Sequence, residues 1–247
     1  MYNSVDDLEK FYSSEIGEIV RKLLARQITE LWPDTHGLRI MGGGYAIPYL
    51  DFASKGAERV FASMTNHQGA AQWPVGKKNM VLMSRDHRLP IENSSIDRIL
   101  LIHHLEFSND MHKAMREIWR VLKPNGRLMV IVPNRMGVWA RADWSPLGHG
   151  RPFTHMQLSQ CLRDSLFQPK ASRTALFVPP LPDSPVIMKS ANIIERMGQS
   201  ILPFVAGVHI IEASKQVYAR ADDSGSGSAV LAKTKGFLGA KPIPTPQ

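Results

Sequence analysis

The chain has 247 residues, of which 43% are hydrophobic and 21% are charged. This length accommodates one large domain or two small ones, and the composition is that of an ordinary soluble globular protein. The single cysteine excludes an internal disulfide and a zinc site built from several cysteines. No basic segment followed by an apolar one opens the chain, and the most apolar region, 193–211, is interrupted by Glu195, Arg196 and Pro203. We therefore expect a cytoplasmic protein without a signal peptide or a transmembrane segment.

The net charge of +8 permits attraction to nucleic acid or to an anionic membrane. The basic residues are scattered along the sequence, which favours a solvated surface over a nucleic-acid interface, although nucleic-acid binding stays an alternative. His103 and His104 are adjacent, and His112 faces another way, so the histidines predict no metal site.

The first structural element is a helical region over residues 4–32. Ser4 is placed to cap its first turn, with Asp7 three residues further on. Apolar residues between Ile16 and Leu31 fall on one helical face, and Pro33 ends the region.

Short apolar runs and amphipathic helices then alternate. Uninterrupted apolar runs are typical of parallel strands that are covered on both faces. Between the fourth and fifth runs lies a helix that Asp110 caps and that ends at the turn Pro124-Asn125-Gly126, and a second helix covers 156–166. The alternation predicts a doubly wound α/β sheet. The five runs are Leu38–Met41, Arg59–Ser63, Asn79–Met83, Arg98–Ile102 and Arg127–Val132.

The last third of the chain predicts a strand at 172–178, a helix near 190–201 and a closing strand within 207–220. Residues 221–247 are rich in Gly, Ser and Pro and show no hydrophobic period, which is typical of a disordered tail. The expected organisation is an N-terminal helical cap (1–36), an α/β domain (37–220) and this tail (221–247).

Three stretches resemble the class I S-adenosylmethionine-dependent methyltransferases, in particular their type 11 branch. They are "LPIENSSIDRILLIHHLEFSND" (89–110), "MREIWRVLKPNGRLMVIVPN" (115–134) and "GHGRPFTHMQLSQCLRDSLF" (148–167), and the second is the most specific. The resemblance implies a Rossmann-like, mostly parallel seven-stranded sheet with an antiparallel last strand.

The resemblance also implies S-adenosylmethionine as the cofactor. It places the glycine triplet of "MGGGYA" where the family keeps its cofactor loop, so the implied cofactor-binding residues are Gly42, Gly43, Gly44, Ala46, Asp86 and Leu89. Two acidic residues common in the family are absent. Ile40 stands two places before the first glycine, and no carboxylate lies between Glu58 and Asp86, where Asn66, His67 and Gln68 are the nearest polar side chains.

Catalytic and acceptor-binding residues follow from the same resemblance. His103 matches a family histidine beside the donor and acceptor and is the candidate base, with a hydrogen-bonded structural histidine as the alternative. Strand alternation points His103 and His104 in opposite directions. Trp144, His149 and Arg151 lie on a loop after the fifth strand run and are candidate acceptor-side residues, with packing as an ordinary cap as the alternative.

These observations favour a methyltransferase that acts on a small-molecule acceptor. The missing acidic residues keep a second interpretation open, a degenerate methyltransferase that serves as a binding or regulatory protein for a protein partner. A third interpretation, an RNA methyltransferase, uses the basic surface.

Overall fold

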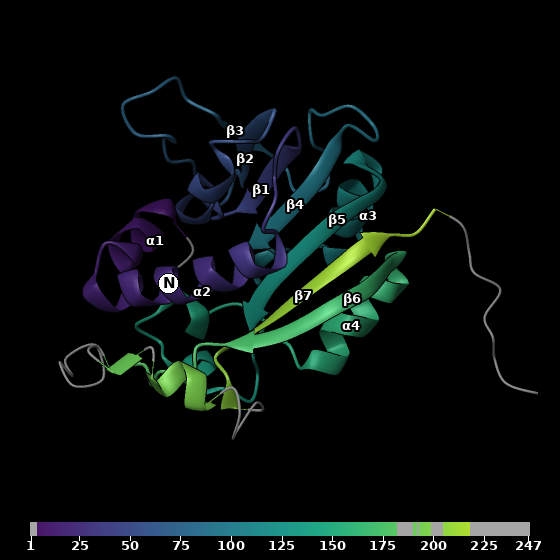
Figure 1. Ribbon diagram of the computed structural model, residues 1–247. Helices are drawn as coiled ribbons and strands as arrows, with labels where there is room; N and C mark the ends of the chain where they lie inside the picture. Colours follow the sequence, from purple (N-terminus) through teal and green to yellow (C-terminus); the bar gives the residue numbers. More distant parts are fainter. Residues whose placement is uncertain (1–3, 182–189, 192, 199–204, 218–247) are drawn as a thin grey trace, which may run out of the picture. The chain divides into compact units, whose positions relative to one another are not determined.

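The computed structural model describes residues 4–181, 190–191, 193–198 and 205–217. Its centre is a seven-stranded sheet with the strand order β3-β2-β1-β4-β5-β7-β6 (Figure 1). Strands β1 to β5 run parallel to one another, and β7 is antiparallel to both β5 and β6. The predicted sheet, mostly parallel with an antiparallel last strand, is therefore confirmed. The strands are β1 (Arg39–Gly44), β2 (Arg59–Thr65), β3 (Val81–Ser84), β4 (Ile96–Ile102), β5 (Leu122–Pro133), β6 (Phe167–Ala175) and β7 (Val208–Lys215).

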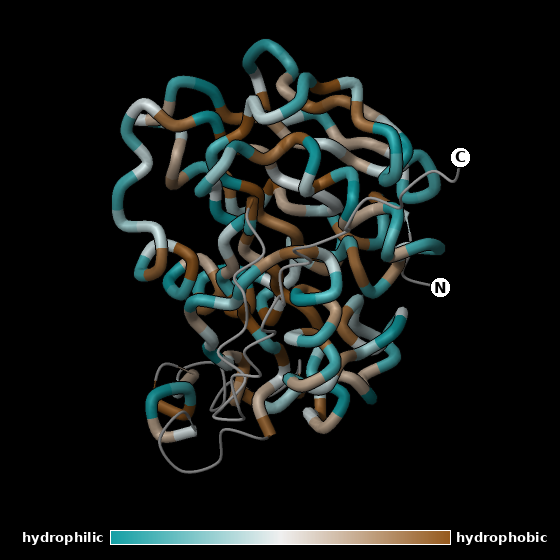
Figure 2. Tube along the Cα trace, turned by 90° about the vertical axis from the view of Figure 1, so that its right-hand side faces the viewer, coloured by the Kyte–Doolittle hydropathy of each residue, from teal (hydrophilic) through white to brown (hydrophobic). Residues whose placement is uncertain are grey.

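Helices cover both faces of the sheet. One face packs against α1 (Val5–Tyr12) and α2 (Glu15–Leu31), and the other packs against α3 (Met111–Val121) and α4 (His155–Asp164) (Figure 1). Successive residues of one strand enter opposite cores: Ile99 lies with α3 and α4, and Leu100 with α1 and α2. Burial on both faces explains why the strands are continuous apolar runs. In Figure 2, the hydrophobic segments lie mostly in the interior and the outer loops are hydrophilic.

The helical region over residues 4–32 consists of two helices instead of one. Ser4 caps α1 as predicted, because its side chain accepts a hydrogen bond from Asp7 N. Ser14 adopts an extended backbone conformation and its side chain accepts a hydrogen bond from Gly17 N, so it begins α2 as a second cap. Gly17 lies against the backbone of Phe11, where a side chain would not fit. The chain therefore breaks at Ser13–Ser14 and folds back on itself.

The N-terminal helices share their core with the sheet. Trp32 Nε1 donates a 2.9 Å hydrogen bond to Glu212 on β7, and Arg173 on β6 pairs with Glu30 at the end of α2. The described residues up to Val217 form one compact unit. The boundary expected at residue 36 stays a prediction of sequence organisation, and the tail at 221–247 lies outside the described residues. No helix in the described part of the chain is long and apolar enough to cross a bilayer.

Several boundaries differ from the sequence-based expectations. β6 spans 167–175 instead of 172–178, because α4 ends at Asp164 and the chain enters the strand at once through Leu166, whose φ is +61°. β7 spans 208–215. Residues 190–191 and 193–198 are helical, and the rest of the helix expected near 190–201 lies outside the described residues.

The glycine triplet is part of β1, not a loop after it. Gly42, Gly43 and Gly44 pair in register with Leu100, Leu101 and Ile102 of β4. Gly44 has a φ of +71°, and a Cβ there would overlap the Ile102 carbonyl oxygen and lie 2.7 Å from the His103 carbonyl oxygen. The missing side chain therefore allows β1 and β4 to approach closely at their carboxyl ends.

We expect Gly44→Ala to cost much more stability than Gly76→Ala. Gly76 has the same φ of +71°, but a Cβ there would have no atom within 4 Å. The left-handed conformation alone costs an alanine about 1–2 kcal/mol, whereas Gly44→Ala adds the overlap with β4 and should cost about 3 kcal/mol or more. Urea unfolding of both variants measures the difference, and equal losses of stability would contradict a close approach of the two strands.

His209 is a buried histidine in the middle of the sheet. It lies on β7 between Val132 of β5 and Thr174 of β6, and within the described residues neither ring nitrogen has a hydrogen-bond partner. Burial and the nearby His155 lower the pKa of His209 from 6.5 to about 4. The imidazole is therefore neutral at pH 7.

This pKa predicts that the protein loses stability in mild acid. Below pH 6.5 the unfolded chain takes up a proton that native His209 does not accept until about pH 4. The free energy of unfolding therefore has its full value, as far as His209 is concerned, above pH 6.5. It should decrease by about 2 kcal/mol between pH 7.5 and pH 5. Urea unfolding at both pH values should show a smaller decrease for His209→Phe than for the wild type, whereas the exposed-site control His112→Gln should behave like the wild type.

Candidate active site

The backbone at the end of β4 adopts a conformation that is unusual for a side-chain-bearing residue. His103 has a φ of +52°, and its carbonyl oxygen accepts a 2.7 Å hydrogen bond from Gln68 Nε2. The side chains of His103 and His104 diverge, as expected: His103 contacts Tyr12 of α1, and His104 lies beside Gly43 of β1. A positive φ on a non-glycine residue at the carboxyl end of a parallel strand is typical of a functional site.

A buried polar chain runs from α1 to the turn after β4. Tyr49 donates its hydroxyl hydrogen to Tyr12 Oη over 3.1 Å, and Tyr12 Oη lies 2.8 Å from His103 Nε2. On the other side of the ring, His103 Nδ1 lies 3.3 Å from Glu106 Oε1. The side chains of His103 and Glu106 are each only 1% exposed. No pattern in the sequence identified Tyr12, which is 91 residues away from His103.

The direction of these hydrogen bonds assigns the tautomer of His103. The Tyr12 oxygen accepts from Tyr49, so its own hydrogen points to His103 Nε2, and the imidazole proton lies on Nδ1, facing Glu106. Burial, followed by the neighbouring Tyr49, raises the pKa of Tyr12 well above 10, so this phenol stays protonated and acts as a donor. An imidazole with an unprotonated, hydrogen-bond-accepting nitrogen on one side and a carboxylate on the other is the arrangement of a general base.

Polar atoms without partners gather at this point of the fold. Within the described residues, the buried Nδ1 atoms of His103 and His104 and both carboxylate oxygens of Glu106 have no aligned hydrogen bond. The 3.3 Å approach of His103 Nδ1 to Glu106 Oε1 is a close contact and does not count as such a bond. Buried polar groups are normally satisfied, so a cluster of unsatisfied ones indicates a place for a polar ligand.

His104 and Asp86 lie on the β3 side of this cluster. Burial lowers the pKa of His104, against the opposing effect of Asp86, so the ring is neutral at pH 7. Asp86 accepts a 2.7 Å hydrogen bond from Ser108 and contacts His87 Nδ1 at 3.0 Å. Burial opposes ionisation of Asp86, but these two hydrogen bonds outweigh it and lower the pKa, so the carboxylate is charged.

Gln68 lies at the end of β2, close to the place where a family member would carry an acidic residue. Its amide nitrogen donates to the His103 carbonyl, its side-chain oxygen accepts from Thr65, and its backbone carbonyl accepts a 2.7 Å hydrogen bond from Val5 N. Gln68 therefore ties together β2, β4 and α1. Both ends of its amide are occupied, which leaves the exposed Asn66 and His67 as the polar side chains free to meet a ligand there.

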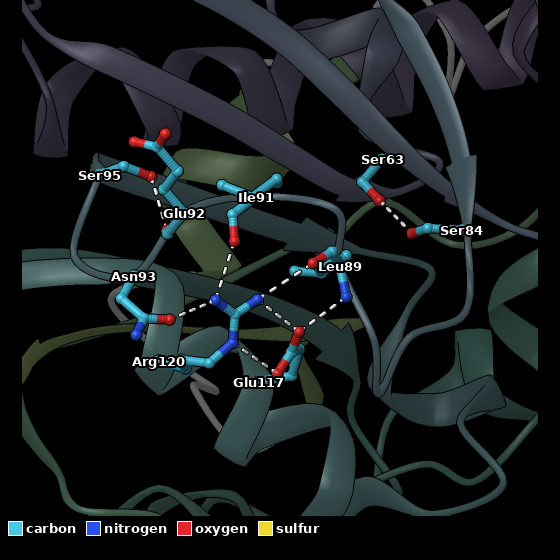
Figure 3. Close-up of polar contacts among 9 residues, drawn as sticks. All are labelled: Ser63, Ser84, Leu89, Ile91, Glu92, Asn93, Ser95, Glu117 and Arg120. Carbon is cyan, nitrogen blue, oxygen red and sulfur yellow. Dashed lines mark hydrogen bonds and ion pairs between the residues drawn. The ribbon is translucent and has the colours of Figure 1, made fainter.

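The backbone of Leu89 is already used within the protein (Figure 3). Its N–H donates a 2.7 Å hydrogen bond to Glu117, and its carbonyl oxygen accepts a 3.0 Å hydrogen bond from Arg120. Arg120 also donates to the carbonyl of Ile91. These bonds hold the connection between β3 and β4 against α3. The Leu89 N–H is thus engaged within the protein, and the role of Leu89 in cofactor binding stays a prediction.

The three predicted acceptor-side residues have different surroundings. Trp144 packs between Phe11 and Trp139, with ring centroids 6.3 and 6.0 Å away, and so belongs to the core. His149 Nε2 lies 2.7 Å from the Asp143 carbonyl oxygen within the loop. Arg151 lines a pocket of about 390 Å³ between α3 and α4, together with Ser108. The loop is therefore packed at Trp139 and exposed at Arg151, and the acceptor-side role of its residues stays a prediction.

Two sequence comparisons place these features in a known family. Residues 41–130 match the family model of a methyltransferase domain of type 11. The sterol 4-C-methyltransferase strm-1 of Caenorhabditis elegans is 27% identical over 130 residues. The chain spans well under half of that protein, because the match covers 49% of this chain and 38% of the relative.

Solved structures show the same fold. A methyltransferase from Thermotoga maritima, described as a possible histamine N-methyltransferase, is 18% identical with a TM-score of 0.59, over 86% of this chain and 96% of that one. A putative methyltransferase of Haloferax volcanii, in complex with the activator Trm112, is 17% identical with a TM-score of 0.57, over 78% and 88%. Strand order and family match agree: residues 41–130 match a type 11 methyltransferase domain, and the chain has the fold of S-adenosylmethionine-dependent methyltransferases.

Proposed function

We propose that the protein transfers a methyl group from S-adenosylmethionine to a small-molecule acceptor, and that His103 removes a proton from the acceptor. The observation that carries this proposal is the buried Glu106–His103 pair at the carboxyl end of β4, beside Gly43 and Gly44. Ligands of open α/β folds bind at this end of the strands, where the strand order reverses. In the present sheet the order reverses between β1 and β4.

The residues at this place fit the cofactor. Nδ1 of His104 and the carboxylate oxygens of Glu106 are buried polar atoms without partners in the described part of the chain, as expected where a polar ligand completes the structure. The backbone at 42–46, His104 and Asp86 would hold the cofactor. When bound, S-adenosylmethionine supplies a methyl group on a positively charged sulfur, which is a good leaving group.

The protein's own residues then have two tasks. His103 Nε2 takes the proton of the acceptor, and the carboxylate of Glu106 stabilises the imidazolium that forms on the other side of the ring. Helix α1, with Tyr12 over the site, keeps water away from these buried groups.

A small acceptor suits the burial of the base. His103 is 1% exposed beneath α1, so a reacting group on a large folded partner could not reach it without displacing this helix. The names of two similar proteins also refer to small molecules, a sterol and histamine.

The proposed function makes a prediction about cofactor binding. We expect S-adenosylmethionine and S-adenosylhomocysteine to bind the wild-type protein in calorimetry, and Asp86→Asn to weaken binding by about 10-fold or more, because a hydrogen bond to a charged group contributes about 1.5–3 kcal/mol. The matched control is Asp97→Asn. Asp97 pairs with Lys123 at the opposite end of β4, so its replacement should leave the affinity unchanged.

Calorimetry also separates this proposal from the non-catalytic alternative. A folded wild-type protein that gives no heat with either ligand at millimolar concentration would contradict a working cofactor site. The site would then belong to a degenerate methyltransferase, in which Tyr12 and its neighbours have closed the cleft permanently.

The proposed function also makes a prediction about His103 as the base. His103→Gln keeps a polar side chain but cannot accept and hold the proton, so kcat should decrease by about 100-fold or more, while the affinity for S-adenosylmethionine changes little. His155→Gln is the control, because His155 is an exposed histidine on α4 that contacts Ser172. A His103→Gln variant with wild-type kcat would show that the acceptor loses its proton elsewhere.

A further inference from the structure

The proton-accepting atom of His103 is already occupied by the protein itself. Nε2 has one lone pair, and the Tyr12 hydroxyl donates to it over 2.8 Å. A base whose only acceptor position is filled cannot take a proton from another molecule. His103 therefore requires that the Tyr12 hydroxyl leaves before any acceptor reacts.

The ring of Tyr12 lies in an aromatic cage. Tyr45 stacks on it with a centroid distance of 5.7 Å and an interplanar angle of 19°. Tyr49 and His103 approach its edges, each with a centroid distance of 5.8 Å. Tyr45, Tyr49 and His103 belong to the turn after β1 and to the end of β4, so these three walls do not depend on α1. Phe11 of α1 is a fourth neighbour, edge-on to the Tyr12 ring at a centroid distance of 5.1 Å. Such walls suit a planar aromatic ring that carries one hydroxyl group.

Tyr12 is also placed where it can be exchanged. It is the last residue of α1, an eight-residue helix that Ser13 and Ser14 join to α2. A helix of this length is not stable by itself in water and is kept in place by its packing. If a phenol replaces the Tyr12 side chain, the cage does not change. The incoming hydroxyl donates to His103 and accepts from Tyr49 as the Tyr12 hydroxyl did.

We infer that Tyr12 stands in for the methyl acceptor, and that the acceptor is a small aromatic alcohol of the phenol class that displaces the Tyr12 side chain from His103. This inference rests on the proposed function and names its substrate class. The acceptor oxygen forms a bond to the methyl carbon as the bond from that carbon to sulfur breaks with its electron pair left on sulfur. The hydroxyl proton moves to His103 Nε2, so the positive charge passes from sulfur to the imidazolium.

The test uses 4-methylphenol, the side chain of tyrosine as a free molecule, and toluene, which lacks only the hydroxyl group. In the full-length wild-type protein without cofactor, saturating 4-methylphenol should increase hydrogen exchange of the α1 amides at least fivefold, and toluene should not. The His103 Nε2 resonance in ¹⁵N NMR should keep the shift of a hydrogen-bond acceptor, because one phenol replaces another.

Two matched variants sharpen the test. Tyr12→Phe removes the competing hydroxyl, so 4-methylphenol should bind about fivefold more tightly than to the wild type, the equivalent of one ordinary hydrogen bond. Tyr49→Phe removes a hydrogen bond that Tyr12 and the probe would both accept, so it should leave the affinity for the probe unchanged.

The inference is overturned if 4-methylphenol leaves the exchange of α1 unchanged, if toluene acts equally well, or if Tyr12→Phe binds the probe no better than the wild type. A purely structural Tyr12 predicts these results. The phenol experiment contains no cofactor, so its failure does not contradict methyl transfer. A calorimetry experiment without a binding signal for S-adenosylmethionine contradicts the proposed function, and it does not test the phenol site.

Discussion

The close approach of β1 to β4 at Gly43 and Gly44 is the constraint on which the rest of the site depends. It is possible only because these positions carry no side chain, and it is fixed by the hydrogen bond from Tyr45 N to the Ile102 carbonyl oxygen. Tyr45 is thereby placed beneath α1, and the chain after β4 turns through His103 at a positive φ. The glycines thus shape the site from within the sheet, before any ligand is considered.

The site combines features that cost stability elsewhere in proteins. Four consecutive positions, 103–106, hold a buried carboxylate, two buried imidazoles and a non-glycine residue at positive φ. Among the described residues, one nitrogen of each imidazole has no aligned hydrogen bond. Each of these features costs free energy unless a partner compensates it, and such costs are concentrated where a protein binds or reacts. Gln68, which follows β2, and Arg120 of α3 offset part of this free-energy cost, because their hydrogen bonds fix the surrounding backbone.

Helix α1 connects the stability of the fold to the accessibility of the site. Leu8 and Phe11 are buried in the main core, while Tyr12 at its end is hydrogen-bonded to His103. Packing of this short helix therefore determines whether the base is covered. The same helix contacts Gln68 through Val5, so movement at its end is coupled to the end of β2 as well.

The sequence by itself determined the alternation of strands and helices, the helices after β4 and β5 and the strand-end positions of Gly42–Gly44, Asp86 and His103. Burial on both faces makes each parallel strand a continuous apolar run, and the resemblance assigned the motif residues to strand ends. Only the tertiary structure decided that Tyr12 meets His103, that Leu89 is bound by Glu117 and Arg120, and that Trp144 belongs to the core. These contacts join residues far apart in the chain, through side-chain geometry that no local period or propensity encodes.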